Sequence, residues 1–348
     1  MLKYGNSWIF QHFNNNNRIL SSRLCVYTPA HYIKTTNMTI QDKSKQSKWS
    51  FLIYSILTLY YFGSIIFTYF SDYPTFGNVH EHFQTFMNLT IRIREIGFIP
   101  PAVLMLFSTF SLLRYNQTDF PRWTIIASIG LAVVSVSTSL FVVFPIYLDM
   151  GSLGFNVENQ HKLLSSSMNF QIIPAIIQCL ILVGLMNVYF KETSPTRRWL
   201  FIVIFFITFY TLGFAMFDTT EVPIWLSVGE KDWMAYRHSG TLGFGGFAAI
   251  YLLPGVLPMF LMIPLFWLRP PNIPLYLPVI RFILSMIILF VSATYFAPKI
   301  QFELDKGYSR TLIDDYWLRQ FGRYSLAVIT YILTALMFLK IDSNRITQ

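Results

Sequence analysis

Long runs of apolar residues, separated by short polar loops, make up most of the chain after residue 49. A helix needs about 20 apolar residues to cross the hydrocarbon core of a bilayer. Eight runs approach this length, the last of them least well, because its charge-free part from Tyr324 to Leu339 has 16 residues. The runs cover residues 50–70, 93–113, 123–147, 168–190, 198–217, 245–268, 277–297 and 321–340. The pattern predicts an all-α, polytopic transmembrane protein of eight helices.

Prolines and glycines recur at one spacing along this pattern. Pro101 and Pro254 each stand in an apolar run and are 153 residues apart. The same offset joins Pro121 with Pro274, Pro145 with Pro298, and Gly154 with Gly307. With four helices in each half, both halves have the same orientation in the membrane. We therefore expect two parallel four-helix repeats, related by an axis along the membrane normal.

The repeat divides the chain into four segments. The two membrane repeats cover residues 49–192 and 193–340, and a short inner tail follows at 341–348. Residues 1–48 hold seven Lys or Arg and a single acid, Asp42. This composition fits a mitochondrial transit peptide. It fits better a disordered tail whose charge sets the topology, because a run of asparagines and a proline would interrupt a long helix.

Composition supports a lipid environment for most of the chain. Hydrophobic residues make up 54% and charged residues 12%, whereas soluble domains carry roughly 25% charged residues. The net charge of +9 comes from basic residues spread along the chain, not from the clustered footprint of a nucleic-acid-binding protein. The expected partner is the lipid bilayer, and we expect no nucleic acid.

The loops alternate in charge along the chain. Lys and Arg collect near both termini and in the loops at 114–122, 191–198 and 269–274, while the acids collect in the other loops. By the positive-inside rule, both termini face the cytosol. In the mitochondrial inner membrane, which is one membrane that fits, they would face the matrix.

The prolines have a direct structural meaning. Proline removes a backbone donor and clashes with the carbonyl one turn earlier, so Pro100 and Pro101 should kink the second helix and Pro254 the sixth. The kinks could form a cavity or hinge at one depth, but we favour a packing feature. Pro145 and Pro298 fall at the far ends of the third and seventh helices, where we expect them to mark the helix boundaries.

Polar residues define one face of the last helix in each half. Gln171 and Gln178 are seven residues apart on the fourth helix, and the repeat offset carries them to Tyr324 and Tyr331 on the eighth. Seven residues are two helical turns, so each pair shares a face. These four residues are candidates for a polar path or pocket. We favour ordinary hydrogen bonds between helices, which are worth roughly 0.6 kcal/mol each in membranes.

Histidines provide the weakest candidates for ligands. His80 and His82 flank Glu81 before the second helix, and His161 and His238 precede the fourth and sixth. Histidines from different helices can hold a metal or a haem. His80 and His82 are two residues apart and would point in different directions on a helix, so we expect solvated loop residues. No metal site is predicted, and the sequence does not identify a cofactor.

Each half resembles a tetraspan unit with a long loop before its second helix and a proline in that helix. The residues that carry this likeness in the second half are Glu221-Val222-Pro223-Ile224-Trp225, Trp233, Tyr236, His238, Trp267-Leu268-Arg269-Pro270, Trp317-Leu318-Arg319 and Arg323. The chain is similar to a group of poorly characterised duplicated tetraspan membrane proteins, and more loosely to the anthrone oxygenase-like four-helix membrane family. The likeness covers residues 50–340 as general architecture and carries no catalytic residue onto this chain.

These observations favour a scaffold, or a binder or carrier of small hydrophobic ligands. Ion-driven pumps need acids or bases within the membrane, and the apolar runs were expected to contain essentially none. Two alternatives are a membrane oxidoreductase, oxygenase-like and acting with a quinone or haem, and a transporter.

Overall fold

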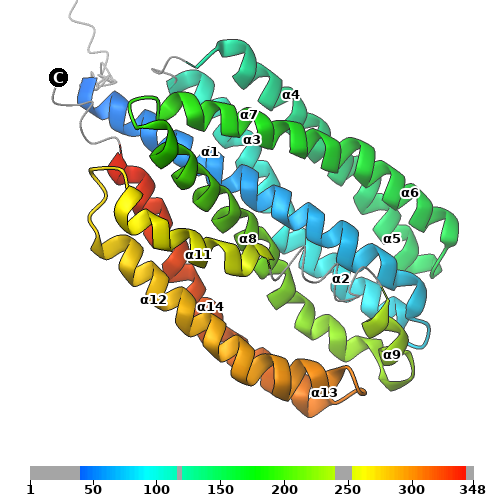
Figure 1. Ribbon diagram of the computed structural model, residues 1–348. Coiled ribbons are helices and arrows are strands. Elements are labelled where there is room, and N and C mark those ends of the chain that lie inside the picture. The colour runs from blue at the N-terminus through cyan, green and yellow to red at the C-terminus, as the bar shows by residue number, and fades with distance from the viewer. Residues whose placement is uncertain (1–39, 116–119, 240–252, 342–348) are drawn as a thin grey trace, which may run out of the picture. The chain divides into compact units, whose positions relative to one another are not determined.

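The computed structural model describes residues 40–115, 120–239 and 253–341, and every element in those ranges is helical (Figure 1). The chain divides into the segment Met1–Thr39 and one compact unit, Ile40–Gln348. Most of the predicted basic segment, and the tail after Ile341, lie outside the described residues. Helix α1 begins at Ile40, nine residues before the predicted start of the first repeat.

The helices follow one another with few irregular connections. The long and short α-helices are α1 (Ile40–Phe67), α2 (Phe83–Gly97), α3 (Ile99–Tyr115), α4 (Arg122–Thr138), α5 (Phe144–Leu153), α6 (Val157–Ser167), α7 (Ile173–Tyr189), α8 (Pro195–Val228), α9 (Glu230–His238), α11 (Leu253–Leu268), α12 (Tyr276–Val291), α13 (Phe302–Leu304) and α14 (Arg310–Ile341). The π-helical segments η1 (Thr68–Asp72), η3 (Ser139–Val143), η4 (Met168–Ile172) and η6 (Ser292–Gln301) and the 3-10 helix η2 (Tyr73–Asn78) join them.

Seven helical stretches in the described part of the chain are long and apolar enough to cross a membrane. They are Gln46–Asn78, Phe83–Arg114, Arg122–Leu153, Val157–Tyr189, Pro195–Met216, Tyr276–Leu304 and Arg310–Ile341. The apolar helix Gly255–Leu268 is shorter, and the start of the predicted run 245–268 lies outside the described residues. The protein is therefore an integral, multi-pass membrane protein.

Large apolar side chains on the surface agree with contact with lipid. Phe141 near the end of α4 is 77% exposed, and Phe290 on α12 is 67% exposed. Along α12, Ile283 and Ile287 are also exposed. A soluble protein would bury such a row of residues, whereas lipid tails solvate it.

Pro145 and Pro298 do not end their helices, so the expectation that they mark helix boundaries was wrong. Helix runs without a break from Arg122 to Leu153 and from Tyr276 to Leu304. A π-helical segment precedes or contains each proline, and this wider turn accommodates the ring without ending the helix.

The four π-helical segments within the described ranges share one relation to the sequence, because each begins six residues before a proline. The pairs are Thr68 with Pro74, Ser139 with Pro145, Met168 with Pro174 and Ser292 with Pro298. In the first three, the residue just before the proline donates its N–H to the carbonyl five residues earlier. The helix thus widens where the proline ring would clash with a carbonyl.

The double proline coincides with a helix break. Helices α2 and α3 are separated by Phe98, and Pro100 and Pro101 stand in the first turn of α3. Pro101 cannot donate to the Gly97 carbonyl four residues earlier, and the hydroxyl of Tyr60 on α1 donates to that oxygen instead, at 2.9 Å. The turn before Pro254, where the second kink was expected, lies outside the described residues.

Helix α1 packs lengthwise against both α8 and α3, and its contact with α8 is unusually close (Figure 1). A Cβ atom at Gly63 would collide with the backbone carbonyl of Tyr210, and one at Gly213 would collide with that of Tyr60. Ser64 Oγ, which donates to the Tyr60 carbonyl at 2.8 Å, also lies 3.4 Å from the Gly213 carbonyl. The two backbones therefore touch, as in small-residue contacts of membrane helices.

Two large aromatic cores lie on either side of this crossing. Near the described termini, Phe51, Tyr189 and Phe338 form one cluster of rings. At the other end, which we call the distal end, Trp225 and Trp233 belong to the second core together with residues of η2, α2, α5, α6, η6 and α14. The distal core therefore packs helices η2 to α6 against helices α8 to α14, in addition to the contact between α1 and α8.

Replacing Gly63 by Ala should destabilise the protein strongly, by about 3 kcal/mol, because backbone on the facing helix cannot move aside as a side chain can. Gly130→Ala on α4 is the matched control, since a Cβ there meets nothing within 4 Å and alanine favours helix. Thermal unfolding of the purified protein measures both. Similar behaviour of the two variants would show that the α1–α8 contact is not close.

Tyr60→Phe should lower stability by about 1 kcal/mol, because it leaves the Gly97 carbonyl without the donor that replaces the proline N–H. Tyr69→Phe serves as the control, because no hydrogen bond of the Tyr69 hydroxyl is found in the described part of the chain. The same unfolding measurement applies. If both variants lose equal stability, the Tyr60 hydroxyl does not compensate for the double proline.

Candidate functional site

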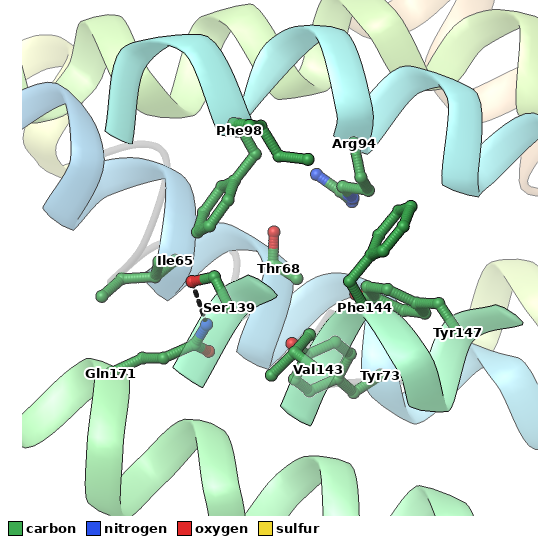
Figure 2. A pocket seen from close by; sticks show the side chains of 11 residues that line it. Ile65, Thr68, Tyr73, Arg94, Phe98, Ser139, Val143, Phe144, Tyr147 and Gln171 are labelled. Carbon is green, nitrogen blue, oxygen red and sulfur yellow. Dashed lines mark hydrogen bonds between the residues drawn. The ribbon is translucent and has the colours of Figure 1, made fainter. Parts of the chain in front are cut away.

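A small cavity lies where the π-helical segments of the first part of the chain face the break at Phe98 (Figure 2). Its volume is about 30 Å³, which is room for a water molecule or two. Side chains from α1, η1, η2, α2, α3, η3, α5 and η4 line it: Ile65, Thr68, Tyr73, Arg94, Phe98, Ile99, Ser139, Val143, Phe144, Tyr147 and Gln171. Prolines therefore shape the backbone on several sides of this space.

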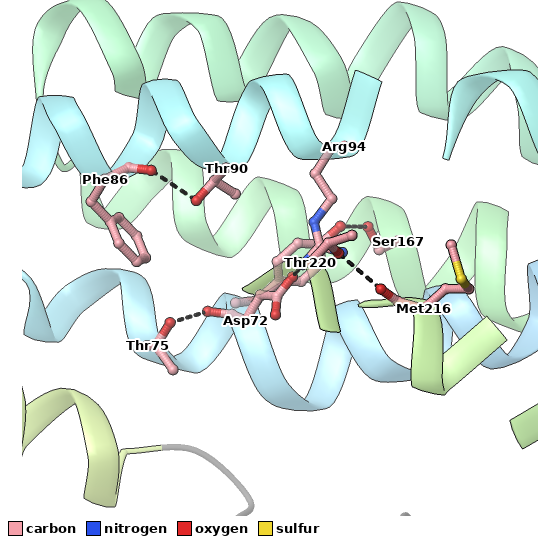
Figure 3. A network of polar contacts seen from close by, with 9 residues as sticks. Asp72, Thr75, Phe86, Thr90, Arg94, Ser167, Met216 and Thr220 are labelled. Carbon is pink, nitrogen blue, oxygen red and sulfur yellow. Dashed lines mark hydrogen bonds and ion pairs between the residues drawn. The ribbon is translucent and has the colours of Figure 1, made fainter. Parts of the chain in front are cut away.

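Arg94 is the charged residue of the lining, and it forms an ion pair with Asp72 (Figure 3). Both side chains are buried, with 4% of Arg94 and 6% of Asp72 exposed. Asp72 ends η1 and Arg94 lies in α2, so two helices bring the charges together. The expectation of essentially uncharged helix interiors was wrong here, because the apolar runs continue into helices whose ends carry these residues.

A buried hydrogen-bond network borders the cavity on the side of Gln171. Gln171 Nε2 donates to Ser139 Oγ at 2.7 Å, and Ser139 Oγ donates to the Ser135 carbonyl at 2.8 Å. The Tyr61 hydroxyl lies 3.2 Å from the same Ser139 oxygen. The network links α1, η3 and η4 and fixes the wall of the cavity.

Two further polar atoms of the lining make no hydrogen bond of normal geometry among the described residues, although one of them, the Tyr147 hydroxyl, interacts with the Tyr73 hydroxyl. They are Thr68 Oγ1 and the hydroxyl of Tyr147, and both are buried. In Figure 2 the Thr68 hydroxyl points into the space below Arg94. Buried polar groups almost always have a partner, and the cavity beside these hydroxyls has room for one.

The structure separates the four residues that were candidates for a polar path. Of these four, Gln171 lines the cavity, whereas Gln178 is buried two turns further along α7. Tyr324 lies on α14, where its hydroxyl is 3.4 Å from Gln320 Nε2. Tyr331 packs its ring against Phe209. The hypothesis of one polar path through these residues therefore remains a prediction, while Gln171 belongs to a defined site.

The candidate ligand histidines are all exposed and none lines the cavity. His80 and His82 lie in the turn before α2, His161 lies on α6 and His238 ends α9. Across the described ranges, no group of three His, Cys, Asp or Glu side chains is arranged to hold a metal.

The turn that contains these first two histidines is bound by α9. Asp232 Oδ2 accepts the backbone N–H groups of His80 at 2.5 Å and of Glu81 at 2.7 Å, and Lys231 pairs with Glu81 at 3.0 Å. Partial burial of Asp232 would raise its pKa, but the two N–H groups and the nearby histidines lower the pKa below its usual value. These contacts hold the turn before α2 against α9.

No protein-family model, curated protein or solved structure matches this chain. The site is therefore defined by its own geometry. The sequence pointed to Gln171, because its spacing from Gln178 repeats in the eighth helix, but not to Asp72, Arg94, Thr68 or Tyr147 as site residues. A usable signal was present, since Arg94 and Glu95 stand just before the long apolar run that begins at Ile96.

Arg94→Gln should destabilise the protein by about 3–5 kcal/mol, because it leaves the Asp72 carboxylate buried without its partner. Asp72→Asn should act similarly, and the double variant should lose clearly less than the sum of the two. Thermal unfolding of the three variants measures this coupling.

The exposed pair Asp315–Arg319 is the control, with an Nε–Oδ1 distance of 2.6 Å along α14. Changing both residues to amides should cost about 0.5 kcal/mol or less. Additive losses for Asp72 and Arg94 would mean that the two charges do not depend on one another.

Proposed function

We propose that this protein binds and carries a small amphipathic molecule whose uncharged polar head enters the cavity beside Arg94. The observation that supports this most directly is the pair of buried hydroxyls, Thr68 Oγ1 and Tyr147 Oη, that face the cavity without a hydrogen bond of normal geometry in the described chain. Asp72 neutralises Arg94, so the site favours a head that donates and accepts hydrogen bonds without net charge. Alcohols, phenols and quinones have this chemistry.

Apolar side chains of the lining suit the apolar part of such a molecule. Phe98, Ile99 and Phe144 line the cavity and are each partly exposed. The present volume accepts water molecules only, so a ligand requires α3 to move at the break before Ile99. Pro100 and Pro101 leave the helix without two backbone donors directly after the turn at Phe98, so this is where we expect it to bend.

We also propose that the fold is eight helices in two parallel repeats. Tyr60-x-x-Gly63 on α1 and Tyr210-x-x-Gly213 on α8 make matching contacts with each other. The packing of α1 with α3 and α7 has its counterpart in α8 with α11 and α14. The π-helical segments at Ser139 and Ser292 begin at the repeat offset. An axis between α1 and α8 accounts for all three observations.

The charge of the loops supports an orientation with both termini on the cytosolic or matrix side. The cavity then lies in the outer half of the first repeat, near the distal end. Its ligand would enter from the outer leaflet or from the space outside.

A transporter coupled to proton or ion movement is the second candidate function, and the Asp72–Arg94 pair favours it. Ionisable residues within membrane helices often mark pathways for ions or substrates. Protonation of Asp72 would leave Arg94 charged and alter the site. The oxygenase-like hypothesis remains a prediction, because the exposed histidines lend it no site.

Binding of decanol and of a short-tailed benzoquinone to the purified protein tests the carrier proposal. Each probe should raise the melting temperature of the wild type by at least about 3 °C. Tyr147→Phe and Thr68→Val should reduce this rise, because each removes one of the two hydroxyls that face the cavity. Tyr69→Phe should keep it.

Equal responses of Tyr147→Phe, Thr68→Val and Tyr69→Phe would contradict the proposed site. Flux of a bound probe between proteoliposomes and acceptor vesicles, compared at two pH values, then distinguishes the carrier from the coupled transporter. A coupled transporter loses its pH response in Asp72→Asn, whereas a passive carrier has none to lose.

A further inference from the structure

A second buried arginine, Arg281, lies in α12, which belongs to the proposed second repeat. Arg281 is 2% exposed, and the helix Tyr276–Val291 contains no other charged residue. It stands five residues after the start of this helix, roughly 7.5 Å along its axis. The side chain is therefore inside a membrane-spanning stretch and not in a loop.

The contacts of Arg281 satisfy only part of its guanidinium. Nη2 donates to Thr208 Oγ1 on α8 at 2.6 Å. The Thr208 hydroxyl donates in turn to the Ile204 carbonyl at 2.5 Å, so its oxygen serves as the acceptor for Arg281. Nε and Nη1 of Arg281 have no acceptor among the described residues.

Three other arginines of the described chain pair with a carboxylate. Arg94 pairs with Asp72, Arg237 with Asp305 at 2.6 Å, and Arg319 with Asp315. No Asp or Glu of the described chain pairs with Arg281. A buried charge that lacks a counter-charge costs free energy in a medium of low dielectric constant, and one hydrogen bond from a neutral threonine does not offset this cost.

We propose that Arg281, together with Thr208, binds an oxyanion, a carboxylate or phosphate group, in the interior of the second part of the chain. An oxyanion supplies the missing negative charge and accepts an N–H group from Nε or from Nη1, each of which shares one edge of the planar guanidinium with Nη2. This site uses other residues than the proposed cavity and does not depend on its function. The oxyanion comes either from a free small anion or from the head of an amphiphile.

Thermal unfolding of the full-length protein in a neutral detergent tests the site, with tryptophan fluorescence as the signal. Decanoate and decyl phosphate are the amphiphilic probes, acetate and inorganic phosphate are the free anions, and decanol is the uncharged control. At least one anion should raise the melting temperature of the wild type by about 3 °C more than decanol does. Arg281→Gln should abolish this excess and keep the response to decanol.

Arg319→Gln is the matched control, because Arg319 already has a carboxylate partner, and it should keep the excess. A response to decanoate but not acetate assigns the site to an amphiphile, whereas equal responses assign it to a free anion. An excess that survives in Arg281→Gln overturns the proposal. So does a wild type that none of the anions stabilises beyond decanol, and this outcome does not depend on whether any variant folds.

Discussion

The contact between the backbones of α1 and α8 is the constraint on which the other packing depends. Gly63 and Gly213 allow the two helices to touch, and any side chain at either position would push them apart. Because α1 also packs on α3, this spacing sets how far Tyr60 is from the helix break at Phe98. Lipid provides no hydrophobic force between helices, so close backbone contact and hydrogen bonds must hold the bundle together.

Proline placement explains why the cavity lies where it does. A proline inside a long membrane helix frees a carbonyl and widens or breaks the helix, and in this molecule several such positions fall at one level. The π-helical segments at Thr68, Ser139 and Met168 and the break at Phe98 all contribute side chains or edges to the cavity. The same irregularities that relieve proline clashes therefore leave space that the side chains do not fill, and buried polar residues collect there.

The sequence allowed the helical membrane fold to be predicted, because the bilayer imposes a minimum length on every apolar run. It did not allow the ends of the helices to be predicted. Pro145 was expected at a boundary, but a π-helical turn carries the helix past it to Leu153. The ion pair of Asp72 and Arg94 was missed for a related reason: each residue stands at the polar margin of a run, and only the folded chain shows that the margins meet inside it.

The two proposed repeats differ more in their buried charges than in the arrangement of their helices. In the proposed repeat, Arg281 stands where the first part has Ser128, whose hydroxyl lies 3.0 Å from that of Tyr54. A neutral pair of hydroxyls needs no counter-charge, whereas an arginine in the same place does. Retaining that arginine in a membrane helix without a carboxylate costs stability in the unliganded protein. A bound oxyanion would remove this cost. A purely structural role would be met equally well by a serine, as it is at position 128.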